Sequence, residues 1–427
     1  MGSLAGRRAR ELPLNLMDKG VGGALFDGQA EQVTPAGEES LRPTLLFLVT
    51  EDWYFNLHRI PLADGARHLG LRVVVAARDN GDLDLLARRG FVLEPLKWRR
   101  GHFNLPKLLL ETLEIRRLYR RVRPDMVHQV AMKPSLIGSL AALGVPIPGI
   151  VNNLAGLGQA FSRSDWRARL MRLLLRQAFR FAFRSKRSIT IVENPDDYDY
   201  LRKVVGIEPE RLRLIRGVGV NTGCFVPAPP PSGRVVVTMV SRMLWHKGVA
   251  DLVEAARLLR GQGADLLIRL VGDTDEGSQA AVPAARLREW HQEGVVEWLG
   301  FQDDIDAVWR DSHIAVLPSY YREGIPRSLL EAAACGRPII TTDMPGCREI
   351  VRHGLNGLLV PIHDPQQLAA AIAQLAADPA ARQRMGHEGR RMVEQEFGEE
   401  IVVAQTLELY ERFRHTHPRA PVNPALK

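Results

Sequence analysis

The pattern that most constrains the fold is an alternation of apolar, strand-like runs with helical segments, which occurs twice along the chain. The runs are nearly continuous in apolar residues, as is typical of strands that a parallel sheet buries on both faces. A proline-rich stretch, VPAPPPSG at 226–233, separates the two sets and predicts a stiff linker. The sequence therefore predicts an α/β protein with two doubly wound, Rossmann-like domains facing each other across a cleft. The expected strands are 44–50, 72–77, 125–131, 148–153 and 188–193 before the linker, and 234–240, 265–273, 313–318, 338–343 and 357–361 after it.

The same pattern sets the expected domain boundaries. A length of 427 residues suits two domains of ordinary size. The sequence contains no run of about 18 uncharged apolar residues, so no transmembrane helix is expected. Three scattered cysteines without a CxxC pair favour a reducing cytoplasm. The expected units are a flexible tail (1–42), the N-terminal domain (43–225), the linker (226–233), the C-terminal domain (234–395), a helix that can cross back to the N-terminal domain (396–414) and a second tail (415–427).

Positive charge is concentrated in the N-terminal domain. Residues 42–225 contain 31 Lys and Arg against 17 Asp and Glu, a net charge of +14, whereas the whole chain carries +8. Such a surplus is typical of proteins that bind nucleic acid, an anionic membrane or an acidic substrate. Nucleic acid is the least favoured of these partners, because the chain has no recognised binding motif and too few aromatic residues for a stacking platform.

The most basic segment, residues 163–187, carries nine Lys and Arg and one acid, Asp165. Helical spacing would give it an apolar stripe with basic margins, which predicts a helix lying on an anionic membrane surface. The alternative is an amphipathic helix that packs on its own sheet and leaves its arginines in solvent. A second basic cluster lies at 97–110. The stripe consists of Leu170, Leu173, Leu174, Ala178, Phe181 and Phe183, and the expected membrane contacts are Arg167, Arg172, Arg176, Arg180 and Phe181.

Two segments that follow strands of the C-terminal domain carry the candidate ligand-binding residues. The first, SRMLWHKG at 241–248, places Arg242 and Lys247 on a turn that Gly248 closes just before a helix. Two cations and a helix N-terminus form an anion site suited to a diphosphate. The alternative is a surface loop with ordinary charges.

The second segment, YREGIPRSLLEAAACG at 321–336, places Glu323 on a loop and Glu331 more than one turn inside the following helix. The amides near Gly324 and Ile325 are expected to be unpaired and to face the cleft. Glu323 and Glu331 are too far apart in this arrangement to act as a proton-transfer pair. The two carboxylates are therefore expected to bind two parts of one extended ligand. Glu331 lies in an apolar stretch of sequence, where its carboxylate needs hydrogen-bonding partners such as sugar hydroxyls. The alternative makes Glu323 a favourable charge near a helix start and Glu331 a solvated helix residue.

These two segments resemble a known family. REGIPRSLLEAAACGRPIITTDMPGCREIV (322–351) is similar to the E-x7-E signature of retaining glycosyltransferases of family 4, which have the GT-B fold, and SRMLWHKG resembles their diphosphate loop. The likeness extends over most of residues 44–414. Within the family, the chain is most similar to bacterial enzymes that add an N-acetylhexosamine to a polyprenyl-diphosphate-linked sugar, such as the N-acetylgalactosaminyltransferase of the bacillosamine glycan pathway.

The resemblance implies a role for each matching residue. Arg242 and Lys247 would hold the donor diphosphate and stabilise the leaving nucleotide. Glu323 would contact the donor sugar near the reacting centre, as a positioning group rather than a nucleophile, and Glu331 would bind the ribose. The catalytic residues implied are Glu323, Arg242 and Lys247, and the donor-binding residues are Arg242, Lys247, Glu323, Gly324, Ile325 and Glu331.

The resemblance also implies a UDP-sugar donor, retention of anomeric configuration and no metal cofactor. The nearest metal-binding candidate, DTD at 273–275, is interpreted as an ordinary loop after a strand. Many family members carry a histidine after the strand at 148–153, where this chain has Asn152-Asn153-Leu154, so a histidine in that role is not expected. His58 and His128 are interpreted as structural or peripheral.

The expected reaction is transfer of a sugar, an N-acetylhexosamine, from its UDP derivative to a polyprenyl-diphosphate-linked saccharide. It would take place at the cytoplasmic face of the cell membrane, in assembly of bacterial surface or glycoprotein glycans. Lys133 is hypothesised to meet the acceptor diphosphate. Two alternatives stay open: a GT-B sugar-nucleotide epimerase, against which the basic helix argues, and a catalytically silent binding protein, against which the intact set of site residues argues.

Overall fold

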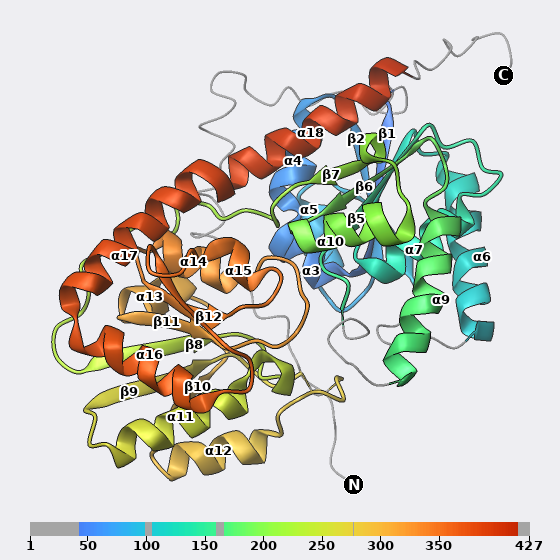
Figure 1. Cartoon of the computed structure of the whole chain (residues 1–427). Helices are drawn as coiled ribbons and strands as arrows, with labels where there is room; N and C mark the ends of the chain where they lie inside the picture. The colour runs from blue at the N-terminus through green and yellow to red at the C-terminus, as the bar shows by residue number, and fades with distance from the viewer. Residues whose placement is uncertain (1–41, 99–104, 159–165, 276, 417–427) are drawn as a thin grey trace, which may run out of the picture.

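Two parallel β-sheets, each flanked by helices, form two Rossmann-like domains that lie against each other (Figure 1). The computed structural model describes residues 42–98, 105–158, 166–275 and 277–416. The predicted α/β class and the doubly wound architecture are confirmed. Both predicted tails lie almost wholly outside the described residues, as do residues 99–104 of the second basic cluster.

The N-terminal domain is built on a sheet of seven parallel strands. Its elements are β1 (Thr44–Glu51), α3 (Asp52–His58), α4 (Ile60–His68), β2 (Arg72–Arg78), α5 (Leu83–Arg88), β3 (Val92–Leu96), α6 (Leu105–Val122), β4 (Met126–Val130), α7 (Met132–Ala141), β5 (Gly149–Leu154), α9 (Trp166–Ala182), β6 (Ser188–Val192), α10 (Pro195–Asp199), η2 (Tyr200–Val205), η3 (Pro209–Arg211) and β7 (Leu212–Leu214). The strand order is β3-β2-β1-β4-β5-β6-β7, so the topological switch point lies between β1 and β4. Helices α6, α7 and α9 cover one face of the sheet.

The C-terminal domain repeats this plan with six parallel strands. Its elements are β8 (Val235–Val240), η4 (Trp245–Lys247), α11 (Val249–Gly261), β9 (Leu266–Val271), α12 (Ala284–Gln292), β10 (Glu297–Gly300), α13 (Ile305–Arg310), β11 (Ile314–Leu317), α14 (Arg327–Ala334), β12 (Ile339–Thr342), α15 (Cys347–Ile350), β13 (Gly357–Val360), α16 (Pro365–Ala377), α17 (Pro379–Met392), η5 (Val393–Phe397) and α18 (Glu399–Thr416). The strand order β10-β9-β8-β11-β12-β13 places the switch point between β8 and β11. Ligands of such sheets bind at the carboxyl ends of the strands beside the switch point.

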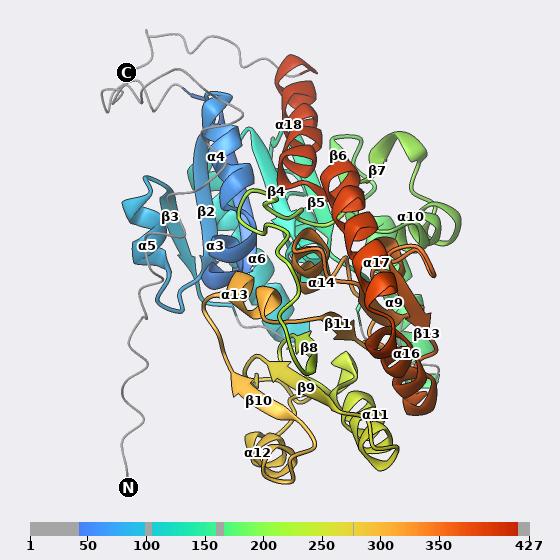
Figure 2. The same ribbon diagram turned by 90° about the vertical axis from the view of Figure 1, so that its left-hand side faces the viewer.

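The last helix, α18, leaves the C-terminal domain and packs across the N-terminal sheet (Figures 1 and 2). Leu407, Tyr410 and Phe413 of α18 belong to the same buried cluster as Phe47 of β1. Gly149 lets the Phe413 ring rest directly on β5, because a Cβ at this position would lie 2.7 Å from the ring. The helix therefore ties the two domains together through apolar contacts.

His128 lies in the core beneath α18. Its Nδ1 shares a hydrogen bond with the Tyr410 hydroxyl (2.5 Å), and its ring stacks on Phe47. Burial lowers the pKa of His128 well below its usual range, with a smaller contribution from Arg59 in the same direction. The histidine is therefore a neutral core residue.

Candidate active site

The loops that follow β8 and β11 meet at the switch point of the C-terminal sheet. Gly248 ends the first loop with a φ of +80°, and a Cβ there would lie 2.0 Å from the carbonyl oxygen of Pro318. Only glycine combines this backbone conformation with so close an approach. The contact brings Lys247 of the first loop to Glu323 of the second.

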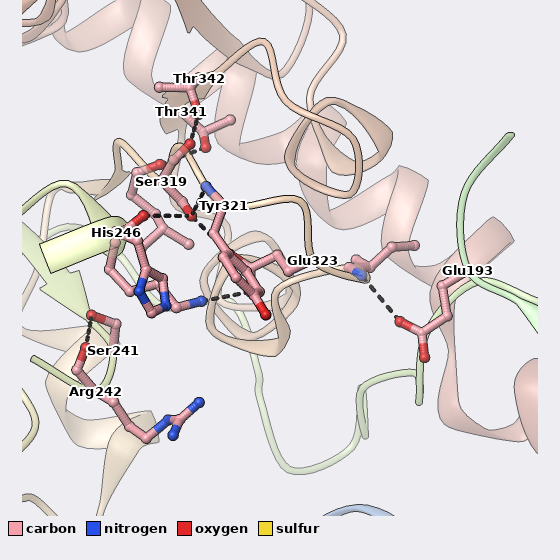
Figure 3. Close-up of polar contacts among 12 residues, drawn as sticks. Glu193, Ser241, Arg242, His246, Ser319, Tyr321, Glu323, Thr341 and Thr342 are labelled. Carbon is pink, nitrogen blue, oxygen red and sulfur yellow. Dashed lines mark hydrogen bonds and ion pairs between the residues drawn. The ribbon is translucent and has the colours of Figure 1, made fainter. Parts of the chain in front are cut away.

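Lys247 and Glu323 form an ion pair that joins the loops after β8 and β11 (Figure 3). Lys247 Nζ lies 2.5 Å from Glu323 Oε2, and the Ser319 hydroxyl donates to Glu323 Oε1 at 2.9 Å. Both charged side chains are mostly buried, with 13% and 16% of their surface exposed. Charges so poorly hydrated interact strongly with a ligand that reaches them. An anionic group would bind at Lys247 and a hydroxyl group at Glu323.

Arg242 follows β8 in the same loop as Lys247, and its Nη1 lies 2.6 Å from Asp275 Oδ2. Asp275 is the last residue of the DTD segment, and its contact with Arg242 gives the segment a role in holding this cation. Among the described residues, no group of three or more histidine, cysteine or acidic side chains could hold a metal ion. Arg242 keeps 44% of its side chain exposed and is accessible to an anionic ligand that competes with Asp275.

Glu331 lies in the second turn of α14 and is 8% exposed, so its interpretation as a solvated helix residue is wrong. Its Oε1 accepts a hydrogen bond from Arg327 Nε at 2.9 Å. Burial raises the pKa of Glu331, and the positive charge of Arg327 opposes this shift. The same arginine donates to the carbonyl oxygen of Leu57 in the N-terminal domain and lies 3.3 Å from His58. Arg327 therefore links Glu331 to the opposite wall of the cleft.

The expectation that the amides of Gly324 and Ile325 are unpaired is wrong. The N–H of Gly324 donates to the Ala155 carbonyl oxygen at 3.3 Å, and that of Ile325 donates to Glu193 Oε2 at 3.2 Å (Figure 3). Both acceptors belong to the N-terminal domain. The reason is that the two domains meet at this loop, an arrangement that the local sequence does not encode.

His246 and Tyr321 flank the Lys247–Glu323 pair, and their ring centroids are 4.5 Å apart. Burial lowers the pKa of His246 to about 4, and the charge of Lys247 acts in the same direction. The imidazole is therefore neutral at physiological pH. Sequence reasoning passed over this histidine, although it lies inside the segment that supplied Arg242 and Lys247.

Lys133 lies in the first turn of α7 and is 8% exposed. Its Nζ is 2.8 Å from Glu111 Oε1 on α6 and 5.7 Å from the centre of the Trp98 ring. The structure thus gives this cation an anionic partner inside the N-terminal domain. Its contact with an acceptor diphosphate stays a prediction.

Asn152, after which the family resemblance would have implied a histidine, belongs to a buried network of polar side chains. Asn152 accepts a hydrogen bond from Ser139 Oγ at 3.0 Å and donates to Ser188 Oγ at 2.8 Å. These contacts join α7, β5 and β6, so Asn152 holds the sheet and its helix together.

Both halves of the chain match glycosyltransferase families. Residues 44–193 match the family described as "Glycosyl transferase 4-like", and residues 225–392 match "Glycosyl transferases group 1". The chain is a family 4 glycosyltransferase. The resemblance of the E-x7-E and SRMLWHKG segments is thereby confirmed, and the protein is an enzyme that transfers a sugar.

Curated relatives of this glycosyltransferase carry names that describe different activities. The chain is 28% identical over 359 residues to the N,N'-diacetylbacillosaminyl-diphospho-undecaprenol alpha-1,3-N-acetylgalactosaminyltransferase of Campylobacter jejuni, covering 81% of this chain and 87% of the relative. It is 27% identical over 321 residues to the alpha-maltose-1-phosphate synthase of Mycobacterium tuberculosis, covering 67% and 79%.

Solved structures place this glycosyltransferase in the GT-B fold. Sucrose-phosphate synthase from Thermosynechococcus elongatus superposes with a TM-score of 0.75 at 22% identity, covering 88% of this chain and all of that one. HepE from Anabaena, in complex with UDP and glucose, superposes with a TM-score of 0.70 at 21% identity, covering 86% and 99%.

Proposed function

We propose that this glycosyltransferase moves an N-acetylhexosamine from a UDP-sugar to a polyprenyl-diphosphate-linked saccharide, with retention of anomeric configuration. The observation that carries the proposal is the similarity to the Campylobacter jejuni transferase, which acts on a diphospho-undecaprenol-linked sugar and spans nearly the same length of chain. The arrangement of cations and carboxylates at the C-terminal switch point supports a nucleotide-sugar donor.

The ion pairs of the cleft suggest how the donor would bind. A diphosphate would replace Glu323 on Lys247 and Asp275 on Arg242, so two cations would face the charge that develops on the leaving nucleotide. Glu323, released from Lys247, would accept hydroxyl groups of the donor sugar. Glu331, more than a turn away on α14, would accept the ribose hydroxyls while Arg327 holds its second oxygen. No metal ion is needed in this scheme.

Incubation of the protein with a panel of UDP- and GDP-sugars and a synthetic polyprenyl-diphosphate-linked sugar tests the proposal directly. A mass increase of one N-acetylhexosamine, only with a UDP-sugar donor, is the expected result, and the anomeric coupling constant of the product reports retention. Turnover with a GDP-sugar, or transfer only to a water-soluble acceptor, would contradict it.

The same proposal places the enzyme on the cytoplasmic surface of the membrane, where its acceptor lies. Helices α6 and α9 both pack against α7 on one face of the N-terminal sheet. No described helix is long and apolar enough to cross a bilayer. The outward faces of α6 and α9 instead expose large apolar side chains, each with 44–68% of its surface accessible. These are Leu109, Leu110 and Leu113 on α6, and Trp166, Leu170, Met171, Leu173, Leu174 and Phe181 on α9.

The predicted apolar stripe of α9 needs one correction. Phe183 is 1% exposed and packs with Phe179 and the η2 helix in the core, because it falls on the sheet-facing side just beyond the end of α9. Arg172 and Arg176 are half-buried beside Tyr200, whereas Arg169 and Arg180 are exposed. Nothing is described of the Arg167 side chain, so its membrane contact stays a prediction, as do those of Arg172, Arg176, Arg180 and Phe181.

Replacement of Arg169 and Arg180 by glutamine is expected to weaken binding to vesicles that contain phosphatidylglycerol by about 30-fold, because each basic residue near an anionic surface contributes ~1 kcal/mol. Vesicle co-sedimentation at low salt measures the effect. The matched control replaces Arg257 and Arg260 on α11 of the C-terminal domain. The assignment of the α9 surface would be contradicted if the two double variants lost the same vesicle affinity. It would also be contradicted if vesicle binding did not depend on ionic strength.

A further inference from the structure

The loop that carries Glu323 is held from both sides by the N-terminal domain. Just before it, Arg322 donates to Asp197 Oδ1 at 2.7 Å, and just after it, the N–H of Ile325 donates to Glu193 Oε2 at 3.2 Å. Glu193 and Asp197 come from the segment that follows β6, and both are buried, at 3% and 0% exposure. We call these two contacts the clasp.

Backbone contacts reinforce the clasp. The N–H of Gly158 donates to the carbonyl oxygen of Arg322 at 3.1 Å, and Ala155 accepts from Gly324. Between them, Gly156 adopts a φ of +91°, and a Cβ there would lie 2.6 Å from the carbonyl carbon of Glu323. The loop after β5 therefore lies directly on the backbone of the Glu323 loop.

The Glu323 loop lies between β11 and α14, outside any regular helix or strand, so tertiary contacts fix its position. On the C-terminal side these include the contacts of Glu323 itself with Lys247 and Ser319. The Tyr320 N–H also donates to the His246 carbonyl oxygen at 3.1 Å, and Gly346 lies so close to the loop that a Cβ there would be 2.1 Å from the Gly324 carbonyl oxygen. On the N-terminal side they are the clasp and the loop after β5. A donor that binds Lys247 would replace the ion pair between Glu323 and Lys247. The clasp would then be among the remaining contacts that hold the Glu323 carboxylate in place.

We propose that Glu193 and Asp197 are positioning residues for sugar transfer, which hold Glu323 at the donor sugar only when the two domains are closed. The proposal rests on the assignment of Glu323 to the donor sugar. In this arrangement the donor site is completed from the N-terminal domain, the side from which the acceptor approaches. Transfer is thereby coupled to closure.

Asp197→Asn is the first test, and Asp196→Asn is its matched control. Both residues lie on α10 and pair with an arginine of the C-terminal domain, but Asp196 lies 3.9 Å from Arg348 and keeps 39% of its side chain exposed. Loss of a buried, hydrogen-bonded partner is severe, whereas exposed pairs contribute little. With the UDP-sugar that the wild type uses, kcat is expected to fall by about 30-fold in Asp197→Asn, since displacement of a reacting group by ~1 Å costs up to 100-fold. Asp196→Asn is expected to retain kcat within about twofold.

Two further measurements separate positioning from other roles. The Kd of UDP, from calorimetry, is expected to stay within about threefold of the wild-type value, since UDP lacks the sugar that Glu323 contacts. Small-angle scattering is expected to show a larger radius of gyration for Asp197→Asn alone, and this readout tests the clasp even if the wild type turns over no UDP-sugar. A folded Asp197→Asn variant with normal kcat and dimensions, or with UDP affinity reduced in proportion to kcat, would overturn the proposal.

Protonation of Glu193 gives the second test. Burial raises the pKa of Glu193 to about 7, Arg59 and the Ile325 amide oppose the shift, and Asp197 and Glu323 add to it. A carboxyl group whose pKa is higher in the closed form favours closure at low pH, and this contribution is lost as pH rises through about 7. kcat is therefore expected to decline above pH 7, by at most about tenfold per pH unit.

Glu193→Gln should remove this decline, because the amide oxygen still accepts from Ile325 but the side chain cannot ionise. Glu193→Ala should lower kcat at every pH, because it removes the acceptor. An unchanged pH profile in a folded Glu193→Gln variant would show that Glu193 does not control closure.

Discussion

Replacing Lys247 with methionine is expected to lower kcat by about 1,000-fold, the upper end of the effect of removing one group that stabilises developing charge. The ammonium lies 2.5 Å from Glu323 in a cleft where both side chains are mostly buried. Under the proposed mechanism it faces the leaving diphosphate, whose charge grows as the bond to the sugar breaks. Methionine has a similar length and no charge, so it leaves this charge without a partner.

Single-turnover kinetics with the UDP-sugar that the wild type uses measure the loss. Lys203→Met is the matched control, since Lys203 pairs with Asp199 on the surface of the N-terminal domain and both side chains are more than half exposed. Lys247→Arg should recover part of the rate, because the charge returns with a different geometry. A Lys247→Met variant within about tenfold of the wild type would exclude this lysine from transition-state stabilisation.

The sequence predicted the interior of both sheets but missed three of their four edge strands. Each of the ten expected strands is present within two residues of its expected bounds, whereas β3, β7 and β10 were not expected. All three lie at an edge of their sheet. Edge strands are short and need fewer apolar residues, and β3 even contains a proline. They therefore lack the apolar run by which a buried strand is recognised.

The candidate site could be predicted where one segment carries its own geometry. The distance between Glu323 and Glu331 follows from a loop and a helix in sequence, and Lys247 lies beside a turn that Gly248 closes. The partners of the clasp could not be predicted, because Arg322 and Asp197 are 125 residues apart and belong to different domains. Their meeting depends on how the two sheets face each other.

The segment that contains Glu193 did carry a signal. It follows a buried strand at the carboxyl edge of the sheet, and a helix with Pro195 in its first turn comes directly after it. The Glu323 segment is similar, with a carboxylate between a strand and a helix, although Pro326 is the N-cap residue of α14 and not its first residue.

Replacing Glu331 with alanine is expected to weaken UDP binding by about 100-fold. Hydrogen bonds to a charged group contribute about 1.5–3 kcal/mol each. At the lower end of this range, the loss of two bonds to the ribose hydroxyls corresponds to about 100-fold in affinity. The buried setting of Glu331, at 8% exposure, removes competition from water. Glu331→Gln should lose less, because its oxygen can still accept one hydroxyl and the Arg327 guanidinium.

A double cycle that combines the Glu331→Ala substitution with removal of the ribose hydroxyls distinguishes a direct ribose contact from a general distortion of the binding site. The wild type should bind UDP about 100-fold more tightly than 2',3'-dideoxy-UDP, and Glu331→Ala should bind the two alike. Glu388→Ala, which removes a half-buried carboxylate paired with Arg391 on α17, should preserve the full difference. If Glu331→Ala weakened both nucleotides equally, the carboxylate would act through Arg327 on the interface with Leu57 and His58. The two acids of the E-x7-E segment would then both serve the contact between the domains, and neither would mark the ribose.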